Sequence, residues 1–279
     1  MSTPNSNVKW IVGALVLLVA LAAGAYLWLH QRASAPLASA PAAQAPANVA
    51  TAPPPVQHPI TQAVVTAAPA HSAPLPALAD SDGLVHQTLS EIGAAGAGKL
   101  LAGHALIAHM VGTINALTGR HLPENLLPVR APAGSFRVER TADGELVMAP
   151  DNITRYAHYA RVFDKLDTQA LVDAYVHAYP LFQQAWRQLG YPRTQFNDRL
   201  VTVLDLLLKT PVPAKPPKLE GAGGLYRFVD PRLENLAIGQ KILIRLGPKQ
   251  ETAVLAKLRA IRAALTGKHP AAPATTTTH

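Results

Sequence analysis

The 279-residue chain contains no cysteine, which excludes thiol nucleophiles and thiolate metal sites. Serine is scarce from residue 80 onward, where only Ser81, Ser90 and Ser135 occur, and none lies in a Gly-x-Ser-x-Gly elbow. No two histidines have the His-Glu-x-x-His spacing of a zinc hydrolase. We therefore expect no catalytic residues, no metal and no cofactor, and we predict that the protein is not an enzyme.

Charged residues are missing from two long stretches near the N-terminus. The first, Trp10–Leu29, contains twenty uncharged and mostly apolar residues. A helix of this length spans about 30 Å, the thickness of the hydrocarbon core of a bilayer. We predict a transmembrane helix over 10–29 that attaches the protein to a membrane, after a short polar tail at 1–9. The alternative is a cleavable secretory signal, although the apolar core of a signal usually has only about 7–15 residues.

The second uncharged stretch, residues 33–79, contains ten prolines. Such a composition cannot bury a core and favours an extended, polyproline-like chain, so we predict a disordered Pro/Ala-rich linker over 30–79. The charges that flank the apolar run, Lys9 and Arg32, nearly balance and barely fix its orientation. The linker and the absence of cysteine favour a single-pass inner-membrane protein whose C-terminal domain is periplasmic. The alternative is a membrane-tethered adaptor that faces the cytoplasm.

The remaining chain has the length of one ordinary domain at 80–266, followed by a low-complexity tail at 267–279 that we expect to be disordered. Apolar residues recur at helical spacing within 84–92, 100–117, 153–166, 171–189, 196–207, 233–246 and 254–265. One small β-hairpin is predicted at 136–148, around the turn dipeptide Asp143–Gly144. A Pro/Gly-rich loop is expected at 211–224, and one helix from Asp230 to Leu246. The fold class is therefore mainly α, with several helices and one small hairpin.

A series of distinctive motifs runs through this domain. They are YAHYARVFDKLDTQALVDAYVHAYPLFQQAWRQLGYP, FNDRL, LLLKTP, FVDPRLENLAIGQKILIRLGP and KLRAIRAAL. These motifs resemble those of a family of bacterial membrane-anchored proteins known as a domain of unknown function, and the resemblance covers essentially residues 85–265. The resemblance implies the same layout of anchor, Pro/Ala linker and mainly helical domain. It supplies no catalytic residues.

Two sets of side chains are candidates for binding. The first is a group of helix tyrosines, Tyr156, Tyr159, Tyr175 and Tyr179, which could line a cleft for a glycan or peptide but which we expect to pack the helices together. The second is basic. Residues 209–268 contain 12 Lys and Arg against 4 acidic residues, and Lys241 with Arg245, and Arg259 with Arg262, share helix faces. Such a face could meet anionic lipid or an acidic partner, or it could simply be solvated.

The sequence gives little support to two further functions, nucleotide binding and nucleic-acid binding. Residues 93–99 imitate a phosphate-binding loop, and Asp205 ends an apolar run, but Leu100 replaces the magnesium-binding hydroxyl and an exported domain would meet no ATP. The basic composition does not indicate nucleic acid in that compartment. We expect a binding or scaffolding module of the cell envelope, with an envelope protein or polymer as its partner. The alternative is an envelope hydrolase with a site among the tyrosines, His158 and His177.

Overall fold

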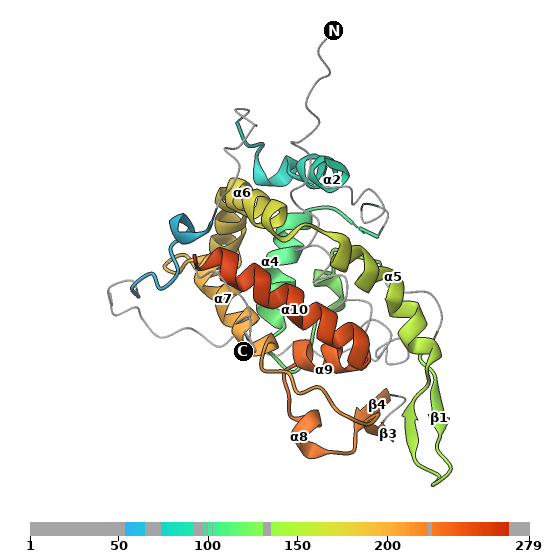
Figure 1. Ribbon diagram of the computed structural model, residues 1–279. Coiled ribbons are helices and arrows are strands. Elements are labelled where there is room, and N and C mark those ends of the chain that lie inside the picture. Colours follow the sequence, from blue (N-terminus) through green and yellow to red (C-terminus); the bar gives the residue numbers. More distant parts are fainter. Residues whose placement is uncertain are drawn as a thin grey trace, which may run out of the picture.

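The computed structural model describes residues 54–64, 74–91, 98, 100–101, 103–130, 135–222 and 225–267. Over these residues the fold is mainly helical with a small antiparallel sheet, as Figure 1 shows. The predicted transmembrane helix at 10–29 lies outside them, as do residues 268–279 and all of the phosphate-loop-like segment except Gly98. Among the helices that are described, none combines the length and apolar character needed to cross a membrane.

The larger helices pack around one core. They are α2 (Asp82–Glu91), α4 (Leu106–Ala116), α5 (Asp151–Lys165), α6 (Thr168–Gln188), α7 (Phe196–Leu207), α9 (Ile238–Arg245) and α10 (Pro248–Leu265). The shorter turns are η1 (Ile60–Gln62), η2 (Leu78–Asp80), η3 (Glu124–Leu126) and the helix α8 (Pro231–Glu234). Buried apolar side chains from the seven larger helices form one continuous cluster, and the mainly helical prediction is confirmed.

Helix α6, the longest of the described helices, begins and ends where its sequence indicates. The carboxylate of Asp167 accepts a backbone N–H of the first turn, which the helix leaves unpaired. At the other end Gly190 has a φ of +105°, and the Tyr191 amide donates to the Trp186 carbonyl at 3.3 Å. This is the Schellman arrangement, in which a left-handed glycine turns the chain away. Between its ends the helix continues through Pro180.

Helix α9 lies at the centre of the fold, and each of its eight residues is buried. Its first amides donate to the chain that follows α4: Ile238 N–H to the Gly119 carbonyl at 2.8 Å, and Gly239 N–H to the Leu117 carbonyl at 3.0 Å. A Cβ at Gly239 would lie 2.8 Å from Cδ2 of Leu207. It would also lie 3.0 Å from the Leu117 carbonyl oxygen, so glycine is needed here for the close approach of α9 to the chain after α4 and to the Leu207 side chain.

The prediction of one helix from Asp230 to Leu246 is wrong. Asp230 does cap a helix, but α8 ends at Glu234 and α9 begins only at Ile238. The chain breaks between them because the first amides of α9 pair with the loop after α4, whereas a continuous helix would use them internally.

The sheet contains β1 (Val138–Arg140), β2 (Leu146–Met148), β3 (Lys218–Ala222) and β4 (Leu225–Phe228), in that order and antiparallel throughout. Strands β1 and β2 form the predicted hairpin. The prediction of a single hairpin is nevertheless incomplete, because a second hairpin of β3 and β4 joins β2 through Leu146 and Leu219. Prolines and glycines around β3 made this segment resemble a loop.

Two parts of the predicted linker lie against the helices. Ala63 and Leu78 are buried in the main core, and Val64 N–H donates to the carbonyl of Ala264 at 2.9 Å. The packed domain therefore begins upstream of Asp80, the residue at which the sequence placed its start.

Candidate interaction site at the sheet end

The four candidate tyrosines lie mainly inside the helical core. Tyr156, Tyr159 and Tyr175 are buried and Tyr179 is half-buried. The Tyr175 ring of α6 lies against the ring of Phe196 in α7, with 6.3 Å between the ring centroids. These are the contacts of side chains that hold helices together, the interpretation favoured from the sequence.

The tyrosine hydroxyls differ in their partners. The Tyr179 hydroxyl is the donor to the side-chain carbonyl oxygens of Gln183 and Gln195, at 2.9 and 3.0 Å. The buried hydroxyls of Tyr156 and Tyr175 have no hydrogen-bond partner among the described residues. Burial raises the pKa of all four candidate tyrosines, that of Tyr175 well above its ordinary value. These hydroxyls therefore stay protonated at physiological pH.

The predicted basic face does not form as one exposed surface. Lys241 and Arg245 are only 9% and 4% exposed, because α9 is enclosed on every side. Arg262 forms an ion pair with Asp205 of α7, and Arg259 is exposed on α10. The four cations thus have three different environments.

The hydrolase alternative depended on His158 and His177. The side chain of His158 lies outside what the structure describes, and His177 is half-buried on α6. Within the described residues no group of three or more His, Cys, Asp or Glu side chains is arranged to hold a metal ion.

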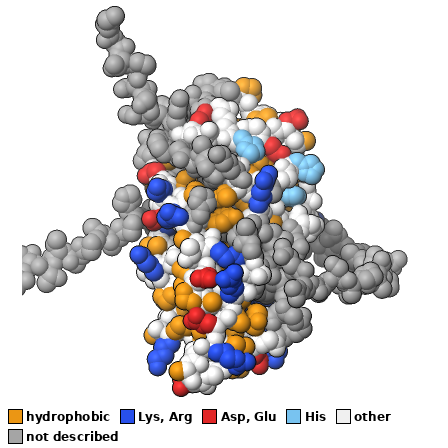
Figure 2. Space-filling view, turned by 90° about the vertical axis from the view of Figure 1, so that its right-hand side faces the viewer, with side chains coloured by type: hydrophobic (Ala, Val, Ile, Leu, Met, Phe, Trp, Pro, Cys, Tyr) orange, Lys and Arg blue, Asp and Glu red, His pale blue; other side chains and the backbone are white. Residues whose placement is uncertain are grey.

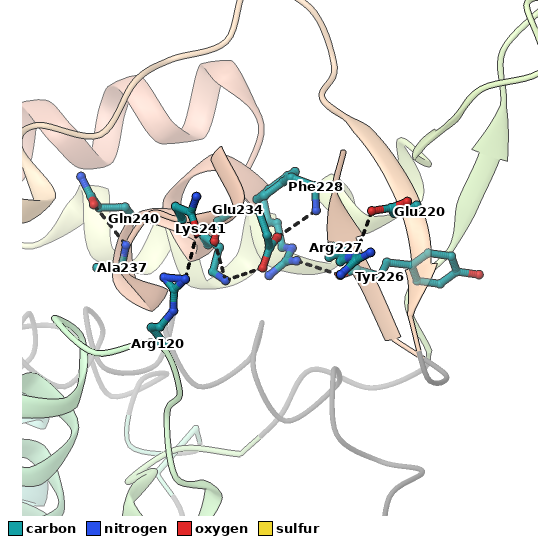
Figure 3. Close-up of polar contacts among 11 residues, drawn as sticks. Arg120, Glu220, Tyr226, Arg227, Phe228, Glu234, Ala237, Gln240 and Lys241 are labelled. Carbon is teal, nitrogen blue, oxygen red and sulfur yellow. Dashed lines mark hydrogen bonds and ion pairs between the residues drawn. The ribbon is translucent and has the colours of Figure 1, made fainter. Parts of the chain in front are cut away.

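Lys241 and Arg245 belong to a polar network that closes one edge of the sheet, shown in Figure 3. Val229 N–H donates to the Lys218 carbonyl at 3.0 Å, so the peptide groups of Tyr226 and Phe228 point away from β3. An open strand edge of this kind would expose unpaired donors and acceptors.

Side chains from α8 and α9 satisfy those peptide groups. Oε2 of Glu234 accepts the Phe228 N–H at 2.9 Å, and Nη2 of Arg245 donates to the Tyr226 carbonyl at 3.2 Å. Lys241 Nζ donates to Oε1 of Glu234 at 2.9 Å. The Arg245 guanidinium also lies 5.0 Å from the centroid of the Phe228 ring. The edge of β4 is therefore covered by charged groups that are themselves paired or stacked.

The charges of the network stabilise one another. Burial opposes ionisation of Glu234, but the hydrogen bonds from Lys241 and the Phe228 amide, with the charges of Lys241 and Arg245, bring its pKa below the ordinary value. Burial lowers the pKa of Arg245, while Glu234 and Tyr156 oppose that change. The Nε atom of Arg245 has no hydrogen-bond partner.

Beside this network lies an apolar surface that we call the sheet-end patch. A second, small core of Phe136, Leu219, Phe228 and Ile244 lies against the sheet. Six half-buried apolar side chains surround it and form the patch: Val138, Leu146, Met148, Tyr226, Leu233 and Leu236. In Figure 2 hydrophobic side chains gather toward the sheet end of the face shown, with acidic and basic side chains among them.

Exposed ion pairs lie on or beside the strands that carry the patch. Arg227 pairs with Glu220 at 2.8 Å across β4 and β3, and Lys218 pairs with Glu145. Arg137 pairs with Asp151, at the start of α5, at 3.1 Å. Apolar side chains among charged ones are typical of surfaces that bind other proteins.

One buried acid lies apart from this network. Glu251, in the first turn of α10, is 0% exposed, and both of its carboxylate oxygens lack a hydrogen-bond partner within the part of the chain that the structure describes. Burial raises its pKa to about 7. Sequence reasoning missed Glu251 and Glu234, because nothing in the helical spacing distinguishes a buried acid from a solvated one.

Comparison with known protein families gives a match for much of the domain. Residues 106–262, more than half of the chain, match the family described as protein of unknown function, DUF3014. The chain belongs to this family. No curated protein and no solved structure matches the chain.

The DUF3014 match begins at α4 and ends within α10, so it includes the sheet, α8 and α9. The closed sheet edge and the sheet-end patch therefore belong to the family domain. The match does not reach residues 10–29, and the membrane anchor stays a prediction.

Proposed function

We propose that the chain is a membrane-anchored protein of the bacterial cell envelope whose DUF3014 domain is a periplasmic binding or scaffolding module. The sheet-end patch is the observation that carries this proposal. It presents six half-buried apolar side chains beside exposed ion pairs, a composition that suits a protein partner better than a polysaccharide.

The closed edge of β4 supports the same function. Glu234 and Arg245 form hydrogen bonds with the peptide groups of β4 to which another strand would otherwise pair. The partner would therefore bind through side chains of the patch rather than by adding a strand to β4. Because the side chains that cover this edge are already held by hydrogen bonds in the free domain, binding of a partner requires little further loss of their conformational entropy.

Site-specific photo-crosslinking in living cells tests the patch. A photoreactive phenylalanine derivative replaces Leu146 or Tyr226 in the patch, and Leu189 or Tyr191 at the far end of α6 as matched exposed controls. We expect discrete adducts with one envelope protein from the two patch positions and none from the controls. Adducts of equal yield from all four positions, or from none, would contradict the proposed surface.

The compartment has its own test. A reporter enzyme that is active only after export, fused after His279, should be active, and alkaline carbonate should leave the protein in the membrane fraction. An inactive reporter with a membrane-bound protein would favour the adaptor that faces the cytoplasm. Release by carbonate would contradict the anchor.

A further inference from the structure

Residues 54–64, upstream of the first helix of the bundle, follow one side of the domain. In Figure 1 this blue segment lies beside α6 and α7, away from the sheet. Its last described residue, Val64, donates its N–H to the carbonyl of Ala264 near the end of α10, and its carbonyl accepts from Nε2 of Gln169 at the start of α6. Three helices therefore contribute to the surface beneath the segment.

The N-terminal part of the segment, at residues 57 and 58, is also held through its main chain. The Asp198 carboxylate, in the first turn of α7, accepts the amides of Gln57 and His58 at 3.2 and 2.6 Å. Nδ2 of Asn197 donates to the His58 carbonyl at 2.8 Å. Asn197 is 0% exposed, and among the described residues its Oδ1 has no partner, so His58 is the partner that this buried side-chain amide finds there. Asp198 and Asn197 thus form a built receptor for the main chain of residues 57 and 58.

Apolar contacts are few. Ala63 is buried in the main core and Ile60 packs partly against it, whereas Val56, Thr61 and Gln62 are exposed. A segment held by two apolar side chains and a few hydrogen bonds separates from the domain far more readily than the domain unfolds.

We propose that the surface formed by α6, α7 and α10 is a docking site for residues 57–64 of the same chain, and that docking is reversible. Release lengthens the free linker. At about 3.1 Å per residue for an extended Pro-rich chain, residues 30–56 would reach about 85 Å and residues 30–73 about 135 Å. The domain therefore has a shorter maximum reach from its attachment point when the segment is docked and a longer one when it is released. This consequence for reach rests on the proposed membrane anchor, whereas docking itself does not.

Engineered cysteines test the identity of the docked segment, because the full chain has no cysteine of its own. Val64→Cys with Ala264→Cys keeps the main-chain contact between these residues. In the purified full chain we expect a disulfide within one chain under mild oxidation. The control pair, Val64→Cys with Thr252→Cys, lies about 18 Å further along α10 and should not form one. A disulfide between two chains, or none, would overturn the proposal.

Hydrogen exchange tests reversibility. Amides of residues 57–64 should exchange more slowly than in an unfolded peptide but faster than those of α4. Asp198→Ala removes the acceptor of two amides and should speed exchange in this segment by about tenfold or more, since hydrogen bonds to charged groups are among the stronger ones. Asp205→Ala, on the same helix and without a contact to the segment, is the matched control.

A second variant separates release from damage to α7. His58→Pro removes the amide that Asp198 accepts and leaves α7 unchanged, so it should speed exchange at 57–64 while the α7 amides stay protected. Unchanged exchange at 57–64 in both variants would overturn the proposal. So would exchange of this segment at the rate of global unfolding, because the segment would then be a permanent part of the core. Neither exchange outcome depends on whether the protein is anchored in a membrane. Failure of docking would therefore be seen in the exchange rates, and failure of the proposed envelope function in the reporter and crosslinking experiments.

Discussion

The Nζ atom of Lys241 lies 2.9 Å from the Oε1 atom of Glu234, and the two side chains are only 11% and 31% exposed. The pair joins α9 to α8, and through the Phe228 amide it reaches the edge of the sheet. A cation and an acid that are separated by seven positions thus connect the helical bundle to the sheet-end patch.

Removal of the cation should therefore destabilise the domain. Lys241→Met leaves the Glu234 carboxylate partly buried without its strongest partner, and we expect a loss of about 1–3 kcal/mol, less than for a fully buried pair because Glu234 is partly solvated. Lys249→Met, at an exposed position of α10, should change stability by less than about 0.5 kcal/mol. Urea denaturation of both variants checks this, and equal losses would contradict it.

The buried Glu251 predicts a pH dependence of stability. Its pKa in the folded protein, about 7, is above the ordinary value of 4.5, so the folded state binds the proton more tightly than the unfolded state. The stability that this group contributes is complete below pH 4.5 and is lost as the pH rises to 7. The loss is about 3 kcal/mol.

Glu251→Gln should abolish this dependence. We expect the variant to be more stable than the wild type by about 2 kcal/mol at pH 8, and the difference to shrink or reverse below pH 5. The quantity to compare is the difference in free energy of unfolding between the variant and the wild type. Burial lowers the pKa of His109, which makes stability rise with pH in both proteins, and this contribution cancels in the difference. Parallel stability curves from pH 4.5 to 8 would show that Glu251 does not titrate in this range.

Much of the helical fold could be predicted from the sequence because its signals are local. Asp167 before α6 and Gly190 after it are capping residues, and the stripe that includes Tyr175 and Phe182 faces the core. The sheet was harder to predict. Only Leu219 of β3 has the apolar character of a strand facing a core, and its partner Leu146 is far away in the chain.

The polar network could not be predicted in the same way. Lys241 and Arg245 have the spacing of an exposed basic face, and only the enclosure of α9 by other helices places them inside. Their partners are Glu234, before a break in the helix, and a carbonyl of β4. The docked segment was also missed, because its contacts are made largely by its main chain, for which composition carries no signal.

Close packing at Gly239 gives a sharp test of the α9 position. A methyl group there would lie 2.8 Å from Cδ2 of Leu207 and 3.0 Å from the Leu117 carbonyl, so Gly239→Ala should cost about 1–3 kcal/mol. Gly83→Ala is the control, since an added Cβ at this exposed position of α2 meets nothing within 4 Å. It should stabilise the domain by about 0.4–1 kcal/mol. Thermal or urea denaturation should give changes of opposite sign, and a neutral Gly239→Ala would contradict the packing of α9 against α7.

The carboxylate of Asp82, a residue of α2, caps the N-terminus of a different helix, α4. Its carboxylate accepts the amides of Ala105 and Leu106 at 2.9 and 2.8 Å, and so satisfies the N-terminal amides of α4, where Ala105 has a left-handed φ of 54°. Asp82→Ala should lower the free energy of unfolding by about 1–2 kcal/mol, as loss of an N-cap does, and should speed amide exchange in the first turn of α4. Asp80→Ala, at an exposed position, should have little effect. If both variants lost the same stability, or if exchange in α4 were unchanged, Asp82 would not be the cap of that helix.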